Sequence, residues 1–165
     1  MSYSFLDHAT DAIIEVTAKN LKEAFSVTAD AVINLTLDQD KVEEKDEKEF
    51  SAQGKDLRYL LFSWLEEITF VLITEGFAIK RIEFDIKEDK GYKIKAKAFG
   101  ESLDLTKHNF KVEIKAPTFY DMEINNNKKK TIAKKPIHPI SLNDTAHGNK
   151  KAVSKSKIMK RMATK

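Results

Sequence analysis

The spacing of apolar residues along the chain predicts two helices. Over 21–35 apolar residues recur every three or four positions. Asn20 stands before this segment with Glu23 three positions later, and that pairing is typical of a helix start. Over 55–77 apolar residues occupy most of the helix circumference, up to Gly76. We expect the first helix to be amphipathic and the second to be largely buried.

Elsewhere apolar and polar residues alternate, which predicts β-strands with one buried face. The expected strands cover 11–18, 79–87, 92–98, 110–114, 120–124 and 131–140, with a short one around 49–53. Gly91 predicts a hairpin turn, and the run Asn125–Lys130 a second turn. The predicted fold class is α+β, two helices packed on a largely antiparallel β-sheet in a two-layer sandwich.

Charge divides the chain of 165 residues into an acidic body and a basic end. Residues 1–125 hold 17 Lys and Arg against 25 Asp and Glu, whereas residues 126–165 hold 12 against one. Beyond residue 140 the aromatic residues and the periodic pattern disappear, and Lys and Ser increase. We therefore expect one domain over 1–140 and a basic, disordered tail over 141–165.

Several classes of protein are disfavoured by composition. The chain has no cysteine, which excludes disulfides and thiolate-bound zinc and fits a reducing, cytoplasmic setting. The N-terminus lacks the basic and apolar segments of a signal peptide, and no apolar run reaches membrane length. We expect no membrane association.

Three ionisable residues, Asp7, His8 and Asp11, come just before an apolar strand pattern. Solvent, a helix end, catalysis or a metal ion are all possible partners for them, and turn capping is the commonest role of such residues. A metal-dependent hydrolase centred on the three is one hypothesis. No glycine-rich phosphate loop and no nucleophile beside a base is visible.

Four blocks of the sequence, in this order and spacing, resemble the archease family. They read FLDHATDAIIEVTAKNLKEAF, DLRYLLFSWLEEITFVLITEGF, KAKAFGESLDLTKH and EIKAPTFYDMEI, and they extend from Tyr3 to Ile124. Archeases are small non-catalytic activators of the RtcB-type RNA ligase, which joins RNA ends chiefly in tRNA splicing. The resemblance implies that the chain promotes guanylylation of the ligase histidine by GTP and repeated turnover of the ligase.

The resemblance also implies a divalent-cation site, calcium in the family, with magnesium or manganese as alternatives. Asp11 matches the motif acid of that site, and the position of the family's terminal Asp falls on His138. An imidazole there would favour a transition metal more than a carboxylate does. No acid lies between Glu123 and Asp144, so we expect an altered or weakened site.

Other residues are expected to support the site or to contact the ligase. The resemblance places Glu101 and His108, in GESLDLTKH, on the functional surface, and Thr118 and Tyr120 beside the cation site, with Asp7 and His8 as further supports. An alternative is a general RNA-binding or chaperone-like module that uses the basic tail. The lysine face at 93–97 is a further possible RNA or ligase contact, although it equally fits the solvated side of a sheet.

Overall fold

The computed structural model describes residues 2–7, 12–117, 122–127 and 130–141, with side chains at 3, 14–114, 122 and 124. The strands are β1 (Ser2–Asp7), β2 (Ala12–Ala18), β3 (Asp46–Gly54), β4 (Phe77–Glu88), β5 (Tyr92–Ser102), β6 (Val112–Pro117), β7 (Glu123–Asn127) and β8 (Lys130–Ser141). The helices are α1 (Leu21–Thr36), α2 (Leu57–Thr69), the 3₁₀ turn η1 (Gln39–Lys41) and the π-helical turn η2 (Phe70–Thr74).

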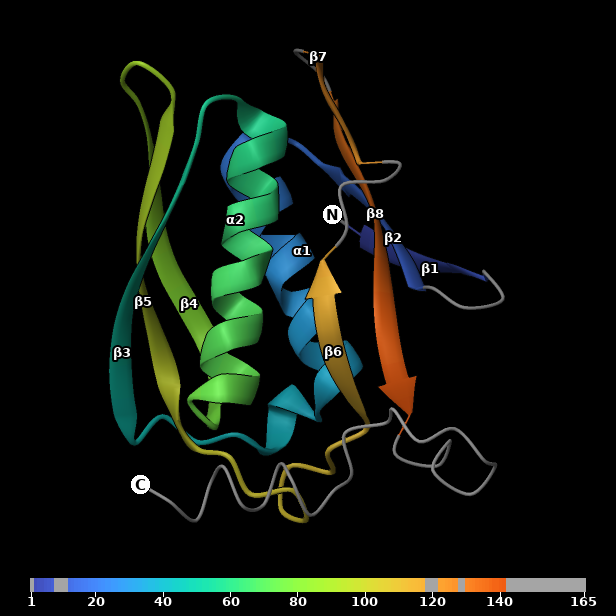
Figure 1. Ribbon diagram of the computed structural model, residues 1–165, viewed down its shortest axis with the longest axis vertical. Helices are drawn as coiled ribbons and strands as arrows, with labels where there is room; N and C mark the ends of the chain where they lie inside the picture. The colour runs from blue at the N-terminus through green and yellow to red at the C-terminus, as the bar shows by residue number, and fades with distance from the viewer. Residues whose placement is uncertain (1, 8–11, 118–121, 128–129, 142–165) are drawn as a thin grey trace.

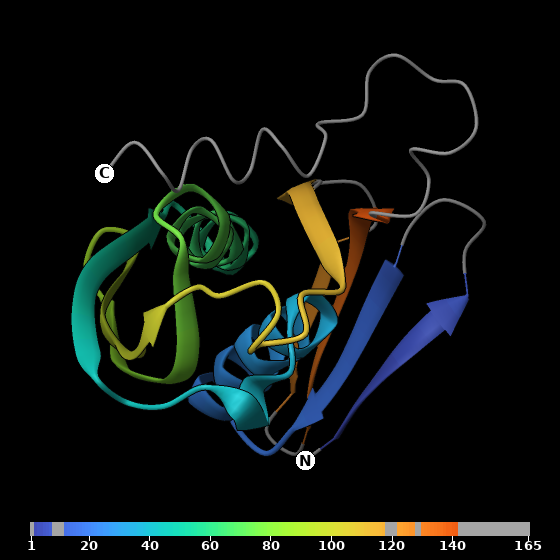
Figure 2. The same ribbon diagram turned by 90° about the horizontal axis from the view of Figure 1, so that it is seen from below.

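The strands form two antiparallel sheets, one on each side of the helices (Figures 1 and 2). One sheet has the order β1-β2-β8-β6, with β7 also paired to β8, and the other has the order β3-β5-β4. The α+β class with antiparallel strands is confirmed. Alternation alone does not specify which strands pair, so the division into two sheets was not predicted.

Both predicted helices are present, and their ends follow from local hydrogen bonds. The Asn20 side chain accepts a hydrogen bond from the Glu23 backbone N–H at 2.8 Å, and the Asp56 side chain caps α2 in the same way at 2.9 Å from Tyr59 N. The second helix was expected to reach Gly76 as one α-helix. Instead its last turn widens into η2, and Gly76 ends it with a φ of 61°.

Three predictions for the strands need correction. β1 was not predicted as a strand, and β3 is longer than the short strand expected around 49–53. Asn125–Asn127 were predicted as a turn but belong to β7, where they pair with β8. Pairing with a neighbouring strand thus overrides the turn preference of asparagine. The predicted tail and its boundary lie outside or at the edge of the described residues, which end at Ser141.

Trp64 joins the helices to the three-stranded sheet. Its side chain is fully buried, and its indole N–H donates to the Phe25 carbonyl of α1 at 3.2 Å. Its ring packs against Phe50 of β3 and Phe84 of β4, with ring centres 5.4 and 4.8 Å away. One residue of α2 therefore fixes the positions of α1, β3 and β4 at once.

Candidate functional site

The structure brings Glu101 and His108 together in a buried cluster at the end of β5. Both side chains are buried, and His108 Nε2 lies 3.2 Å from Glu101 Oε1. Gly100 allows this arrangement because the end of β5 passes very close to β4. A Cβ atom on Gly100 would lie 1.9 Å from the Ala78 carbonyl oxygen.

The Glu101 carboxylate accepts hydrogen bonds from several donors in two other segments. Lys107 Nζ lies 2.6 Å from Oε1, Lys45 Nζ lies 2.9 Å from Oε2, and the Glu43 backbone N–H donates to Oε1 at 2.9 Å. The lysine bonds hold the pKa of Glu101 well below its ordinary value, with a smaller contribution from His108, although burial acts in the opposite direction. Glu101 therefore stays ionised and ties the strand end to the 43–45 segment.

The hydrogen bonds of His108 fix the tautomer of its ring. Nδ1 accepts from the Asp104 backbone N–H at 3.0 Å, so the ring proton sits on Nε2 and points at Glu101. The Asp104 carboxylate accepts from the backbone N–H groups of Thr106 and Lys107, each at 2.9 Å, and these bonds lower its pKa. The loop after β5 is thus folded around two side chains, His108 inside and Asp104 at its start.

This cluster has the contacts of a structural support. Glu101 accepts three hydrogen bonds at Oε1 and one at Oε2, and both nitrogens of His108 are engaged. Across the described side chains no group of three or more His, Asp and Glu residues could hold a metal ion. The predicted supporting role of Glu101 and His108 is compatible with this geometry, and contact with the ligase remains a prediction.

Backbone pairing brings the chain neighbours of three expected site residues to one row of the larger sheet. Ile137 of β8 pairs with Ala12 of β2 on one side and with Pro117 of β6 on the other. Asp11, His138 and Thr118 are the chain neighbours of these three residues. The row thus joins Ala12, Pro117 and Ile137, which are far apart in the sequence, with β2 reaching it from one side along β8 and β6 from the other.

The side chains at these positions lie outside the described part of the chain. Asp11, His8, Thr118 and Tyr120 fall in undescribed segments, while Asp7 and His138 are described only as backbone, in β1 and β8. The cation site is therefore still a prediction. The sequence did not predict the contacts of Lys45 and Lys107 with Glu101. Lys45 is 56 positions and Lys107 six positions from Glu101 along the chain, and neither spacing indicates a contact.

No described helix combines the length and the apolar character required to cross a membrane.

Comparisons with known proteins agree on one family. The profile of the Archease protein family matches residues 3–135, which stops short of His138. "Protein archease" from Pyrococcus abyssi is 41% identical over 119 residues, covering 72% of this chain and 84% of that protein. The corresponding protein from Pyrobaculum islandicum is 39% identical over 126 residues, covering 75% of this chain and 86% of that protein.

The fold also matches a solved structure. The solution structure of protein 1598 from Methanobacterium thermoautotrophicum superposes with a TM-score of 0.67 at 27% identity, covering 82% of this chain and 97% of that one. Sequence and fold thus agree over most of the chain. We conclude that the chain belongs to the Archease family.

Proposed function

We propose that this chain is a non-catalytic activator of an RtcB-type RNA ligase in tRNA splicing. It would speed guanylylation of the ligase histidine by GTP and allow the ligase to turn over repeatedly. Family membership supports the proposal, and the mutual bonding of Glu101, Lys107 and His108 fits a structural role for that cluster. The covalent chemistry would belong to the ligase.

The observation that carries the proposal is the row formed by Ala12, Ile137 and Pro117. In this row Ala12 begins β2 and Pro117 ends β6, and both pair with Ile137 of β8. Asp11 precedes Ala12 in the chain, and His138 follows Ile137. A site held on strands is more rigid than one held on a long loop. In our proposal Asp11, the residue before β2, is presented to the nucleotide site of the ligase, where it orders the reacting groups by position and charge.

The same row is the proposed cation site. Asp11 supplies a carboxylate and His138 an imidazole, a donor set that suits a divalent cation but holds calcium less well than two carboxylates would. The cation would add positive charge beside the triphosphate of the nucleotide. Asp7, His8, Thr118 and Tyr120 would orient the ligands or contact the ligase.

The test is multiple-turnover ligation by a purified RtcB-type ligase, with and without the full-length chain. We expect the chain to convert a ligase that stalls after about one turnover into one that turns over many times. Deleting residues 141–165 should leave this effect intact. Activation lost with the tail would favour the RNA-binding or chaperone-like alternative, and no activation by the intact chain would refute the proposal.

The metal-dependent hydrolase hypothesis makes a different prediction. It requires the chain to cleave a phosphoester without any ligase, with a rate that depends on Asp7, His8 and Asp11. We expect no such cleavage, measured with a fluorogenic phosphodiester and Mn²⁺ in the absence of the ligase.

A further inference from the structure

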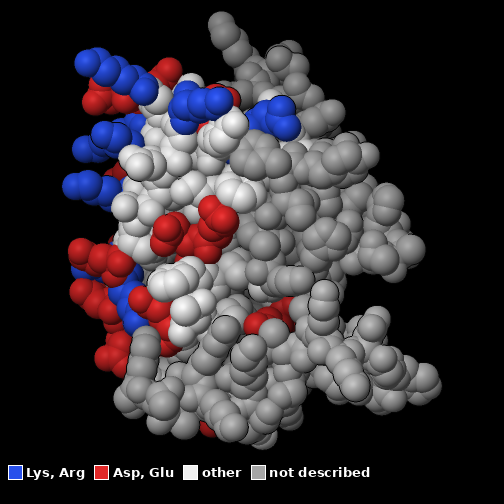
Figure 3. Space-filling model, viewed as in Figure 1, with Lys and Arg blue, Asp and Glu red and all other residues white. Residues whose placement is uncertain are grey.

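Three lysines form a positively charged patch on one face of the β4–β5 hairpin. Lys87 of β4 pairs directly with Lys93 of β5, and Lys95 follows two positions later on the same face. All three are exposed, and we call them the hairpin lysines. Figure 3 shows Lys and Arg side chains projecting from the edge of the molecule where this hairpin lies in Figure 1.

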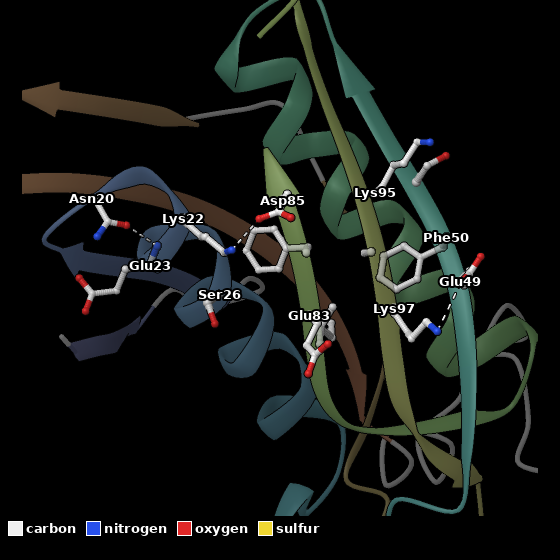
Figure 4. A pocket seen from close by; sticks show the side chains of 14 residues that line it. Asn20, Lys22, Glu23, Ser26, Glu49, Phe50, Glu83, Asp85, Lys95 and Lys97 are labelled. Carbon is white, nitrogen blue, oxygen red and sulfur yellow. Dashed lines mark hydrogen bonds and ion pairs between the residues drawn. The ribbon is translucent and has the colours of Figure 1, made fainter. Parts of the chain in front are cut away.

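Among the described residues the hairpin lysines form no ion pair, although Lys87 is close enough to Asp85 to help Lys22 lower the pKa of that carboxyl. Within the described part of the chain none of them has an ion-pair or hydrogen-bond partner. Asp85 lies opposite Lys95 but is bonded to Lys22 of α1 at 2.8 Å, as the dashed line in Figure 4 shows. Like charges directly across a strand pair, as at Lys87 and Lys93, disfavour folding. The side-chain contacts of the described residues thus do not account for three lysines at this place.

Lys97, the next lysine on the same face, provides the contrast. Its Nζ lies 2.9 Å from Glu47 and 3.5 Å from Glu49, both on β3, and these carboxylates raise its pKa. The positive patch therefore ends at Lys97. The face changes from free lysines near the hairpin turn to neutralised pairs toward the other end of the sheet.

The neighbours of the hairpin lysines indicate the kind of partner. On β3, Gln53 pairs with Lys93 and Ser51 pairs with Lys95, and both are exposed and uncharged. Stable protein interfaces usually have an apolar, aromatic-rich centre, which this set of side chains lacks. Lysines next to uncharged hydroxyl and amide groups are instead typical of contacts to nucleic-acid phosphates.

The surface beside the lysines is hollowed. A groove of about 1130 Å³ runs between the N-terminal half of α1 and strands β3, β4 and β5, and Lys95 and Ser51 line it (Figure 4). Away from Lys95 the lining turns acidic, with four carboxylates at Glu23, Glu49, Glu83 and Asp85. A phosphate backbone would therefore contact the end of the groove beside the hairpin lysines and not its length.

We propose that the hairpin lysines bind the phosphate backbone of an RNA strand. The preference for phosphate rests on the surface itself, and the choice of RNA over DNA rests on the proposed function. Binding is sequence-indifferent, because phosphates carry no base identity. The binding constant decreases as the salt concentration rises. In a plot of log binding constant against log salt concentration, each phosphate contact to a single strand contributes about −0.7 to the slope.

The test measures binding of a fluorescent 20-nucleotide oligouridine RNA by full-length protein at 50 to 200 mM salt. Lys87, Lys93 and Lys95 are changed together to Gln. For this triple variant, the hairpin variant, we expect the slope of log binding constant against log salt concentration to be smaller in magnitude by about 2 than for the wild type. We also expect its affinity at 50 mM salt to be lower by roughly tenfold or more. The matched control changes Lys41, Lys48 and Lys97 to Gln, which alters net charge equally but removes lysines that already have carboxylate partners. The control should keep the wild-type slope.

Two outcomes would overturn the proposal. One is an equal change of RNA affinity in the control and the hairpin variant. An equal loss would assign binding to net charge, and no loss in either would assign it to the tail, which all three proteins contain. The other is binding of oligoglutamate at these lysines as tightly as RNA of equal charge, which would identify an acidic protein as the partner. Circular dichroism checks that each variant is folded. If the triple variant does not fold, the single variant Lys93→Gln is measured in its place.

A second readout separates this inference from the proposed function. Guanylylation of the ligase consumes GTP and uses no RNA, so the hairpin variant should stimulate guanylylation as the wild type does. Loss of RNA binding with full stimulation supports the inference. RNA binding unchanged by the hairpin variant refutes it, whatever the result of the guanylylation assay.

Discussion

At the residue scale, Glu101 is the side chain on which most local order depends. Its carboxylate joins β5 to Lys45, Lys107 and His108. The two lysines are partly exposed, and His108 is fully buried. The sequence indicated that Glu101 and His108 matter, through a resemblance, but gave no reason. The reason is a network of contacts between residues that sequence spacing does not relate.

Replacing Glu101 by Gln should destabilise the protein by about 2 kcal/mol, since hydrogen bonds to a charged group contribute roughly 1.5–3 kcal/mol. Urea unfolding at pH 7 measures the change. The control is Glu47→Gln, which removes an exposed ion pair with Lys97 and should cost less than about 1 kcal/mol. Equal effects of the two substitutions would contradict the central place of Glu101.

The same carboxylate predicts a pH dependence of stability. The folded-state pKa of Glu101 is lowered, mainly by Lys107 and Lys45, so its contribution is present above the ordinary pKa of about 4.3 and is lost as pH falls through the lower folded value. Wild-type stability should therefore decline below about pH 5, and more steeply than that of Glu101→Gln. Parallel declines in urea unfolding between pH 6 and pH 3 would count against this assignment.

His138 offers a second prediction at this scale. Restoring a carboxylate with His138→Asp should strengthen calcium binding by roughly tenfold or more, because calcium prefers oxygen ligands and charge. Isothermal titration with CaCl₂ measures the affinity, and Gln53→Glu, which adds the same charge at an exposed position on the other sheet, serves as the control. Unchanged calcium affinity in His138→Asp would place the cation site elsewhere or remove it.

At the element scale, the helices and the β4–β5 hairpin were predictable because their patterns are local. Asn20, Asp56 and Gly91 mark their starts and turns with residues whose preferences the structure confirms. The two-sheet arrangement was not predictable, since it depends on pairing between distant strands. Asn125–Asn127 show the same limit, because the β8 partner outweighs local turn preference.

The close contact of β5 with β4 gives a prediction for Gly100. Gly100→Ala places a Cβ about 1.9 Å from the Ala78 carbonyl, which the strands can relieve only by moving apart. We expect a loss of at least about 2 kcal/mol and disturbance of the adjacent Glu101 cluster. Thermal unfolding measures it against Ser102→Ala, an exposed position two residues along the same strand. A melting temperature within 2 °C of wild type would show that the strands adapt freely.

At the scale of the whole molecule, the two sheets carry different proposed roles. The five-stranded sheet holds the row at Ala12, Ile137 and Pro117, and the three-stranded sheet holds the hairpin lysines. The helices and Trp64 separate the two faces. Composition showed the acidic body and the basic end but did not show that the body itself carries a positive patch.

The measurement that tests the account most directly is the rate of ligase guanylylation by radiolabelled GTP. It compares wild-type chain with Asp11→Asn and with Asp46→Asn, the latter an exposed aspartate of β3 on the opposite sheet. The account predicts strong stimulation by wild type and by Asp46→Asn, and a loss of roughly tenfold or more with Asp11→Asn. Equal stimulation by all three proteins would contradict the claim that Asp11 takes part in activation.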